Sequence, residues 1–265
     1  MIHPTTVIEP SAKIGKNFKA GPFCYVGPNV TIGNDVELKS HVVIEGHTTL
    51  GNGNIIYPFA TIGHVPQDKK YAGELTYLEI GDDNVIREYV TMHPGTATGN
   101  TVTKIGNRGL FMVGVHVAHD CVVGDDVILA NQATLAGHVV VEDHVIVGGI
   151  SAVHQFVRIG AHAMIGGMSG VEQDVIPFGI VIGERARLSG LNLVGLKRRG
   201  FPQKSISALR EAYRSLFSPD TEEKPSTFQE RLLKLKDEQS DIPEIENLIA
   251  FIQGESHRNL CMPKG

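Results

Sequence analysis

The feature that most constrains this chain is a six-residue repeat of aliphatic side chains. Every sixth residue from position 8 to position 62 is aliphatic or alanine, and the spacing returns twice after interruptions. The repeated positions are Ile8, Ile14, Ala20, Val26, Ile32, Leu38, Ile44, Leu50, Ile56 and Ile62, then Ile80, Ile86 and Met92, then Ile105, Phe111, Val117, Val123, Leu129, Leu135, Val141, Val147, Val153, Ile159, Ile165 and Val171. Such a period is typical of an architecture in which every repeat is one small structural unit.

A second track of mostly small side chains lies two residues before each repeated position, as at Cys24, Val30 and Ala133. Residues two apart on a strand face the same side, so both tracks point inward. Glycine often follows the larger residue, as at Gly27 and Gly124, where it suits a bend. Three such strand-and-bend units close a coil of about 18 residues, and the coils stack as a parallel β-helix. The hexads do not fix its hand, for which right-handed crossovers are the usual default.

Composition and charge argue against several classes of protein. The net charge of −5 does not suit a chain-wide nucleic-acid or membrane-binding surface. No apolar run reaches the roughly 18 to 20 residues that cross a bilayer, and the first residues show no secretory signal. We therefore expect a cytoplasmic protein without a transmembrane segment. Three cysteines do not make a disulfide framework. Two of them, Cys24 and Cys121, fall on the small inward track, which predicts inert core thiols.

The repeat ends near residue 190, and the period of the sequence then changes. Apolar residues recur at helical spacing in 205–217, 227–235 and 241–252, which predicts three helices. Thr227 with Glu230, and Asp241 with Glu244, have the spacing of a capping box. We expect a β-helix over residues 1–190, with loop insertions at about 64–79 and 93–104, and a C-terminal helical domain over 191–265 that covers the open strand edges.

Several polar residues stand out because the repeat does not require them. His119 and Asp120 follow each other at a bend within the stretch VGVHVAHDC, and His116 faces outward just before them. Stacking places residue i beside residue i+18, so Asp120 is expected beside His138, and His119 beside Gly137. The sequence therefore predicts a polar cluster around residues 119–138.

Other histidines divide into two groups. His93 and His154 each directly follow an inward residue, where glycine is common, and they add to the unexplained polar positions. His144 and His162 are not part of a comparable group of unexplained polar residues, so we expect them to be surface residues.

Three functional interpretations of the cluster compete. His119 can be a general base near neutral pH, with a carboxylate on its other nitrogen and the attacking hydroxyl supplied by a substrate. The histidines can instead bind Zn²⁺ between chains, which the H-x-x-H spacing of His116 and His119 allows. The third interpretation is a scaffold without activity, which leaves the cluster and the two interruptions of the repeat unexplained.

Five segments carry a resemblance that spans essentially the whole chain. They are HVAHDC, LAGHV, AVHQF, PQDKKYAGE and GLNLVGLKRRGF. Together with the hexads, they resemble the acyl-[acyl-carrier-protein]–UDP-N-acetylglucosamine O-acyltransferases, which open lipid A synthesis. The resemblance implies a left-handed parallel β-helix and a homotrimer with active sites between subunits. It also implies transfer of a 3-hydroxyacyl group from acyl carrier protein to the glucosamine 3-hydroxyl of UDP-GlcNAc, with no cofactor beyond the phosphopantetheine of the carrier and no metal.

The resemblance also implies roles for individual residues. His119 would be the general base, Asp120 its orienting partner, and Gly137 the donor of a backbone N–H to the oxyanion. Substrate-binding positions would be Asp68, Lys70, His93, His116, His138, His154, Gln155, Asn192 and Arg198. Gly167 and Met168 match the region that gauges acyl length. One position departs from the pattern, because Val194 stands where some members carry an acidic residue.

A basic segment gives an independent indication of a partner. Between Asn192 and Ser215, the only acidic residue is Glu211. The same segment holds six basic residues, Lys197, Arg198, Arg199, Lys204, Arg210 and Arg214. An acidic protein with a local basic segment suits an acidic partner such as a carrier protein. Nucleic-acid binding is not expected, because no aromatic residues interleave usefully with these basic ones.

Two alternative functions remain open at this point. The same base could serve a UDP-sugar that carries a 3-amino group in place of the hydroxyl. A trimeric zinc carbonic anhydrase on the same fold is the rival from another class, and stoichiometric zinc would favour it.

Overall fold

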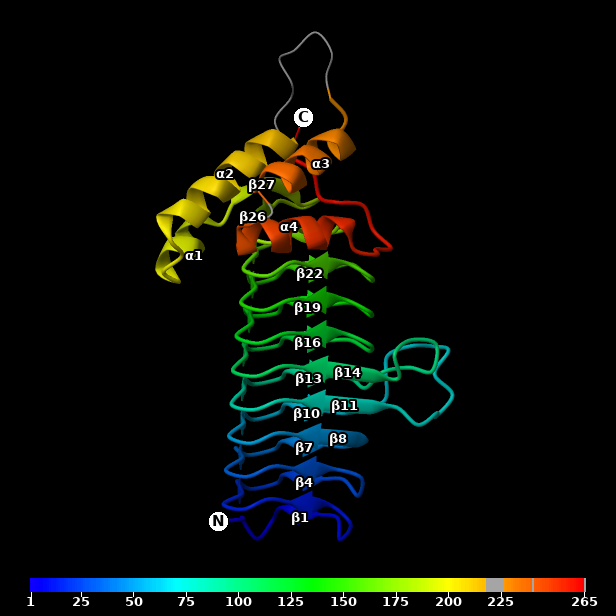
Figure 1. Ribbon diagram of the computed structural model, residues 1–265. Coiled ribbons are helices and arrows are strands. Elements are labelled where there is room, and N and C mark those ends of the chain that lie inside the picture. The colour runs from blue at the N-terminus through cyan, green and yellow to red at the C-terminus, as the bar shows by residue number, and fades with distance from the viewer. Residues whose placement is uncertain (218–225, 240, 265) are drawn as a thin grey trace.

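The protein is a three-sided prism of stacked coils with helices at one end (Figure 1). The computed structural model describes residues 1–217, 226–239 and 241–264. Each coil contributes one short strand to each of three sheets, as the hexads predict. Within the sheets, strands of successive coils pair in parallel, as between His116 and Thr134. Among the strand pairs of the described residues, only the last, β26 with β27, is antiparallel.

The strands fall into three sheets. The nine-stranded sheet consists of β1 (Val7–Ile8), β4 (Tyr25–Val26), β7 (Val43–Ile44), β10 (Thr61–Ile62), β13 (Thr91–Met92), β16 (His116–Val117), β19 (Thr134–Leu135), β22 (Ala152–Val153) and β25 (Gly170–Val171). The eight-stranded sheet consists of β2 (Lys13–Ile14), β5 (Thr31–Ile32), β8 (His47–Leu50), β11 (Tyr77–Ile80), β14 (Val102–Ile105), β17 (Val122–Val123), β20 (Val140–Val141) and β23 (Arg158–Ile159). The ten-stranded sheet consists of β3 (Lys19–Ala20), β6 (Glu37–Leu38), β9 (Ile55–Ile56), β12 (Val85–Ile86), β15 (Leu110–Phe111), β18 (Ile128–Leu129), β21 (Ile146–Val147), β24 (Met164–Ile165), β26 (Gly179–Ile182) and β27 (Arg187–Leu191).

The second residue of each hexad strand points into the prism, as the repeat predicts. Val26, Ile44, Val117 and Leu135 are all fully buried. Cys121 on the small track is also buried, and burial raises the pKa of its thiol to about 12, so it stays protonated and unreactive. The predicted inert core thiol is therefore confirmed at this position.

Three corners join the three sheets, and each one needs an unusual backbone. The residue at the bend takes a positive φ, for example 60° at Asp120, 56° at Asp126 and 60° at Gln132. These values lie in the left-handed region, which asparagine, aspartate and glycine adopt most readily. We call the corner between the nine- and eight-stranded sheets the histidine corner (118–121, 136–139 and 154–157). The corner between the eight- and ten-stranded sheets is the aspartate corner (124–127, 142–145 and 160–163). The third, between the ten- and nine-stranded sheets, is the apolar corner (87–90, 130–133, 148–151 and 166–169).

Two loops interrupt the coils, and both leave the prism at the histidine corner. The first runs from β10 to β11 over residues 63–76, and the second from β13 to β14 over residues 93–101. Their lengths shift the register, so that Thr61 pairs with Thr91 and Thr91 pairs with His116. Figure 1 shows both loops projecting from the same side of the prism, one above the other. The polar residues of both loops therefore lie at a single corner.

Four helices follow the prism within the described residues, where the sequence predicted three. They are α1 (Leu193–Arg198), α2 (Gln203–Phe217), α3 (Phe228–Gln239) and α4 (Pro243–Gln253). The capping box at Thr227 is confirmed, because its backbone N–H donates to Glu230 and its hydroxyl accepts from the Glu230 N–H. The second predicted box is wrong. The N-cap of α4 is Ile242, which makes no side-chain cap, and Pro243 opens the helix instead.

The helices lie over the end of the prism that β25 and β26 would otherwise leave open (Figure 1). Beyond α4, the chain returns to the prism, where Leu260 forms an isolated parallel bridge with Asp174. The division into domains at residue 190 stays a prediction. Within the described residues, no helix is long and apolar enough to cross a membrane.

Candidate active site

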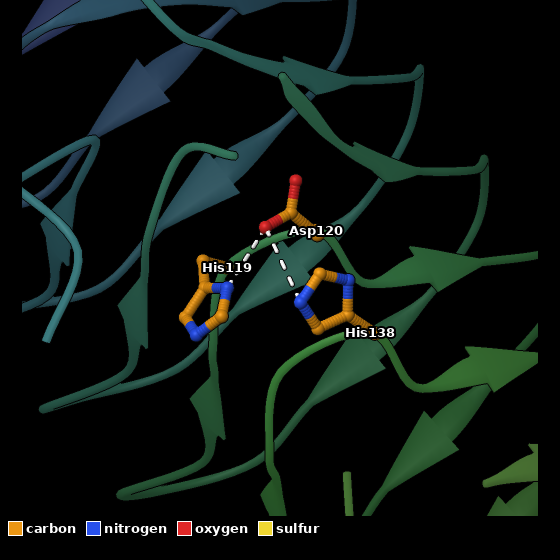
Figure 2. Close-up of side chains that lie close together, drawn as sticks. All are labelled: His119, Asp120 and His138. Atoms are coloured by element: carbon orange, nitrogen blue, oxygen red, sulfur yellow. Dashed lines mark hydrogen bonds and ion pairs between the residues drawn. The ribbon is translucent and has the colours of Figure 1, made fainter. Parts of the chain in front are cut away.

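His119 and Asp120 form the centre of the polar cluster at the histidine corner. Nδ1 of His119 lies 2.8 Å from Oδ2 of Asp120, and Nε2 of His138 lies 3.9 Å from the same oxygen. Figure 2 shows both imidazole rings turned toward this carboxylate. The neighbourhood of Asp120 and His138 that the stacking of coils predicts is therefore confirmed. An Nδ1–H that donates to Asp120 leaves Nε2 of His119 as the free, basic nitrogen.

The second loop holds the carboxylate of Asp120 from the other side. Asp120 accepts hydrogen bonds from the backbone N–H and hydroxyl of Thr96 and from the backbone N–H of Asn100. Its own N–H donates to the hydroxyl of Thr103. Burial disfavours ionisation of this side chain, but the hydrogen bonds from Thr96 and His119 outweigh it and hold the pKa of Asp120 below its ordinary value. Asp120 is thus a fixed anion beside the imidazole.

Gly137 provides the surface against which the imidazole of His119 rests. A Cβ at this position would lie 2.5 Å from Cε1 of His119 and 2.7 Å from its Nε2, so only glycine leaves room for the ring. The next residue, His138, donates its N–H to the carbonyl of His119, which locks the two coils together. Among the described residues, the N–H of Gly137 has no hydrogen-bond acceptor. A donor beside the imidazole of His119 is therefore available to a bound molecule.

A column of rings extends upward from His119 along the histidine corner. His119 meets His138 edge to face at 5.1 Å, His138 stacks on Phe156 at 4.5 Å, and Phe156 contacts His257 at 5.2 Å. Burial lowers the pKa of His138 more than the nearby Asp120 carboxylate raises it. His138 is therefore expected to be a neutral ring at neutral pH.

A groove of about 850 Å³ opens in front of this column. The two loops form one wall and the ring column forms the other. Its lining residues are Gln67, Asp68, Lys69, Lys70, Thr98, Gly99, Asn100, His119, His138, Gln155, Phe156 and His257. The basic nitrogen of His119 thus lies in a polar cleft that is large enough for a sugar and its neighbouring groups.

His119, Asp120 and His138 also meet the minimal requirement for a metal site. One ligand atom from each lies within 4.8 Å of the others. However, Asp120 already accepts hydrogen bonds from Thr96 and Asn100, which suits a carboxylate that orients an imidazole. The geometry therefore favours the general-base interpretation over the zinc-lyase interpretation.

Comparison with known proteins places the chain in a family. Residues 174–261 match the model described as "Udp N-acetylglucosamine O-acyltransferase; Domain 2", and residues 11–46 match "Bacterial transferase hexapeptide (six repeats)". The acyl-[acyl-carrier-protein]–UDP-N-acetylglucosamine O-acyltransferase of Caulobacter vibrioides is 52% identical over 99% of this chain and 98% of its own length. The protein of that name from Thermodesulfovibrio yellowstonii is 51% identical over 98% of both. This chain belongs to the same family.

The solved structures agree with this assignment. The UDP-N-acetylglucosamine O-acyltransferase (LpxA) of Moraxella catarrhalis is 47% identical, with a TM-score of 0.92 over 98% of this chain and 99% of that one. An LpxA structure from Acinetobacter baumannii has a TM-score of 0.92 at 44% identity over 98% of both chains. The predicted left-handed parallel β-helix with C-terminal helices is therefore confirmed, and the default to a right-handed coil does not apply.

Four of the residues that the resemblance assigned to substrate binding line the groove with the base. They are Asp68, Lys70, His138 and Gln155. His154 lies next to Gln155, but its Nδ1 is bound by Arg258 at 2.6 Å. The groove also contains residues that were not singled out from the sequence, among them Asn100, Phe156 and His257. The spacing of one coil from His138 could have identified Phe156, whereas nothing in the repeat marks a residue of the C-terminal tail.

His93 and His116 lie beside the groove and do not line it. Their rings are 5.3 Å apart, Nδ1 of His116 hydrogen-bonds to Thr91, and Nδ1 of His93 contacts the carbonyls of His64 and Val65. Burial is the main cause that lowers the pKa of His116 to about 4, and the neighbouring histidines add to it. His116 is therefore neutral at physiological pH.

Asn192, Arg198 and Arg199 lie at the aspartate corner, away from His119 of the same chain. Asn192 is buried, caps α1 and donates to the carbonyl of His162. Arg199 donates to the carbonyl of His144. The expectation that His144 and His162 are isolated is wrong, because their rings stack at 4.6 Å. Both residues are partly exposed at the surface, and partial burial lowers the pKa of His162 to about 4.

Proposed function

We propose that this protein transfers a 3-hydroxyacyl group from acyl carrier protein to the 3-hydroxyl of UDP-GlcNAc, the first step of lipid A biosynthesis. The observation that carries the proposal is the pairing of His119 with Asp120 beside an unused backbone donor, in a chain of this family. The acyl group arrives on the phosphopantetheine of the carrier, so the proposed reaction needs no further cofactor and no metal. A cytoplasmic location stays a prediction.

In the proposed mechanism, Nε2 of His119 takes the proton of the sugar hydroxyl as its oxygen attacks the thioester carbon. Asp120 holds the ring in the required tautomer and stabilises the imidazolium that forms. The carbonyl oxygen becomes an oxyanion and accepts a hydrogen bond from the N–H of Gly137, which can contribute about 3 kcal/mol of transition-state stabilisation. Collapse of the intermediate expels the thiolate, which takes the proton from His119. No bond forms between the acyl group and the protein.

The test of this function is an assay with UDP-GlcNAc and 3-hydroxyacyl carrier proteins of several chain lengths. We expect release of free carrier thiol together with a 3-O-acylated product identified by mass spectrometry. A UDP-sugar with a 3-amino group serves as the competing acceptor. Turnover of the amino sugar alone would replace the proposed acceptor, and absence of turnover with both would reject the function.

A homotrimer is proposed from the outward faces of the sheets. From β9 to β24, the ten-stranded sheet presents aliphatic side chains outward on successive coils, and its charged outward residues, Lys19 and Glu37, lie in the first coils. The eight-stranded sheet has charged outward residues at both ends, such as Lys13 and Arg158. The outward aliphatic residues are Ile55, Val85, Leu110, Ile128, Ile146 and Met164. On the nine-stranded sheet, the outward positions include Thr91, Thr134, Ala152 and Gly170, which are small and uncharged. From β9 onward, each copy therefore has two faces with few charges, which suits a closed cyclic assembly.

The proposed trimer accounts for the separation of the predicted substrate residues. If the ten-stranded sheet of one copy packs on the nine-stranded sheet of the next, the histidine corner of one lies beside the aspartate corner of the other. Asn192 and Arg198 of a neighbour then complete the cleft in which His119 lies. Gly167 and Met168, which we propose to gauge acyl length, are exposed at the apolar corner. They are therefore also free to face a neighbouring copy.

The basic side chains after the prism are proposed to bind the acidic carrier protein. Five of them are exposed, namely Lys197, Arg198, Lys204, Arg210 and Arg214. The sixth, Arg199, is partly buried against the carbonyl of His144, so we assign it to anchoring α1 on the prism.

The combined substitution Lys204→Glu, Arg210→Glu and Arg214→Glu is expected to raise KM for the carrier protein by about tenfold or more at low salt. The difference from wild type should shrink as salt rises, because the attraction of exposed charges is screened. Steady-state kinetics at two ionic strengths measure this. Lys13→Glu, Lys16→Glu and Lys19→Glu, on exposed residues at the far end of the prism, form the matched control. Equal KM values in both triple variants would contradict the docking site.

A further inference from the structure

The segment after α4 is fixed to the prism on both sides of His257. Ser256 donates its hydroxyl to the buried carboxylate of Asp174, and Arg258 donates from Nε to the carbonyl of Gln155. The N–H of Arg258 also donates to the hydroxyl of Ser256. His257 lies between these two anchors, is exposed, and contacts the ring of Phe156. The tail therefore presents one imidazole at a defined place, and its ring nitrogens have no hydrogen-bond partner among the residues that the structure describes.

His257 extends the column of rings at the histidine corner by one, at the level where the coil itself supplies no ring. Asp120, His138 and Phe156 occupy the same bend on successive coils. The next residue of that series is Asp174, whose carboxylate is fully buried and bonded to Arg158 and Ser256. His257 packs on Phe156 instead. The ring of Phe156 lies 4.5 Å from that of His138 and 5.2 Å from that of His257, so the two imidazoles are within about two coil heights of each other.

A second branch of the groove runs toward this imidazole. It has a volume of about 580 Å³ and is lined by Asn100, His138, Val140, Phe156, Arg158, Glu255, Ser256 and His257. Four of these residues, Asn100, His138, Phe156 and His257, also line the branch that contains the base. The two branches therefore meet beside His138, next to the catalytic pair.

The two branches differ in the chemistry that they can bind. The first carries Asp68, Lys69, Lys70 and Gln155, which suit a hydroxylated, charged sugar nucleotide. In the second, the cation of Arg158 is already paired with Asp174 at 2.8 Å, and the carboxylate of Glu255 would repel a phosphate. What remains there is an aromatic ring, an aliphatic side chain and neutral hydrogen-bonding groups. This combination suits an uncharged chain of methylene and amide groups.

We infer that His257 binds the pantetheine arm of the acyl donor in this second branch, an assignment that rests on the proposed function. The thioester end of the arm would lie beside His119, and the arm would pass over Phe156 to the imidazole of His257. An extended pantetheine is longer than the separation of two coil heights between His138 and His257. Its amides could therefore exchange hydrogen bonds with the imidazole on the way out to the carrier protein.

The test separates the two substrates kinetically. KM and kcat are measured for 3-hydroxyacyl-phosphopantetheine, the donor without its protein, and for UDP-GlcNAc. His257→Ala is expected to raise KM for this donor by about tenfold, with kcat and KM for UDP-GlcNAc within about twofold of wild type, because one hydrogen bond and one ring contact are lost. His257→Asn, which keeps a donor and an acceptor, should recover part of the loss.

Asn259→Ala is the control, since this exposed residue lies in the same tail and its side chain has no hydrogen bond within the described residues. An unchanged donor KM in His257→Ala would overturn the inference. An equal rise in donor KM in Asn259→Ala would also overturn it, as would a rise in KM for UDP-GlcNAc instead of the donor in His257→Ala. A lower melting temperature in His257→Ala, together with loss of turnover, would overturn it as well. If the wild type shows no turnover at all, calorimetry with phosphopantetheine decides the matter. Binding that depends on His257 would support the inference while rejecting the proposed function, and no binding would reject both.

Discussion

His119→Ala is expected to lower the rate of acyl transfer by roughly a thousandfold, because a positioned general base typically contributes 10²- to 10⁴-fold. Asp120, anchored by Thr96 and Asn100, would remain in place, so the loss would come from the missing nitrogen. The side chain of His119 lies at the corner and outside the aliphatic core, at 13% exposure. Its removal should therefore leave the fold intact. Turnover is measured by thiol release at saturating concentrations of both substrates.

The control for this prediction must show that the variant protein is otherwise normal. Circular dichroism and sedimentation velocity should give the same melting temperature and the same assembly size as wild type. His3→Ala removes an exposed histidine from the first coil and should have no effect on turnover. Near-normal turnover in His119→Ala would reject the assignment of the base.

Gly137→Ala is expected to lower kcat by about a hundredfold with little change in the KM of either substrate. The added methyl group would lie 2.5 Å from Cε1 of His119, closer than side-chain carbons approach one another, so the imidazole must move. A displacement of about 1 Å from the productive geometry can cost about a hundredfold in rate. The φ of Gly137 is not among the positive values, so alanine fits the backbone and the effect should come from the ring alone.

Gly27→Ala is the matched control because it tests the same change at a comparable bend. A Cβ at Gly27 would come no closer than 3.4 Å to any neighbour, which is an ordinary contact. This variant should retain wild-type kcat. A crystal structure of Gly137→Ala should show the His119 ring displaced from Asp120. An undisplaced ring with normal kcat would contradict the close packing described for this corner.

The sequence predicts the prism well because one physical rule, the burial of every sixth side chain, determines most of it. The same rule extends from fold to site: Asp120 and His138 hold equivalent positions on adjacent coils, and they meet at the same corner. Periodicity is thus enough to predict that these two residues, distant in the sequence, lie together. Periodicity predicts no contacts for the segments outside the repeat.

The features that the sequence did not predict all involve segments outside the hexads. Thr96 and Asn100 reach Asp120 from a loop whose path no period describes. His257 reaches Phe156 from the tail, which depends on the packing of α4 and on the anchors at Ser256 and Arg258. In each case, a long-range contact decides the position, and local pattern carries no information about it.

His162 illustrates the same limit at another corner. Its spacing from His144 predicts that the two rings lie on adjacent coils, and they do stack. However, its burial comes from Phe178 and Phe201, which pack against it from later segments of the chain. The sequence did not predict this partial burial, because those segments fold back onto the aspartate corner.

The regular stacking of the coils has a consequence for how such proteins can diverge. Each coil adds a fixed rise of about 4.8 Å, so the height of the base below the helices can change only in whole steps of that size. Deleting a few residues from a coil would turn inward side chains outward. Deleting one whole coil would keep the interior and shift His119 by one coil height. Relatives in which the counterpart of His119 lies at a different distance from the C-terminal helices should therefore differ by whole coils.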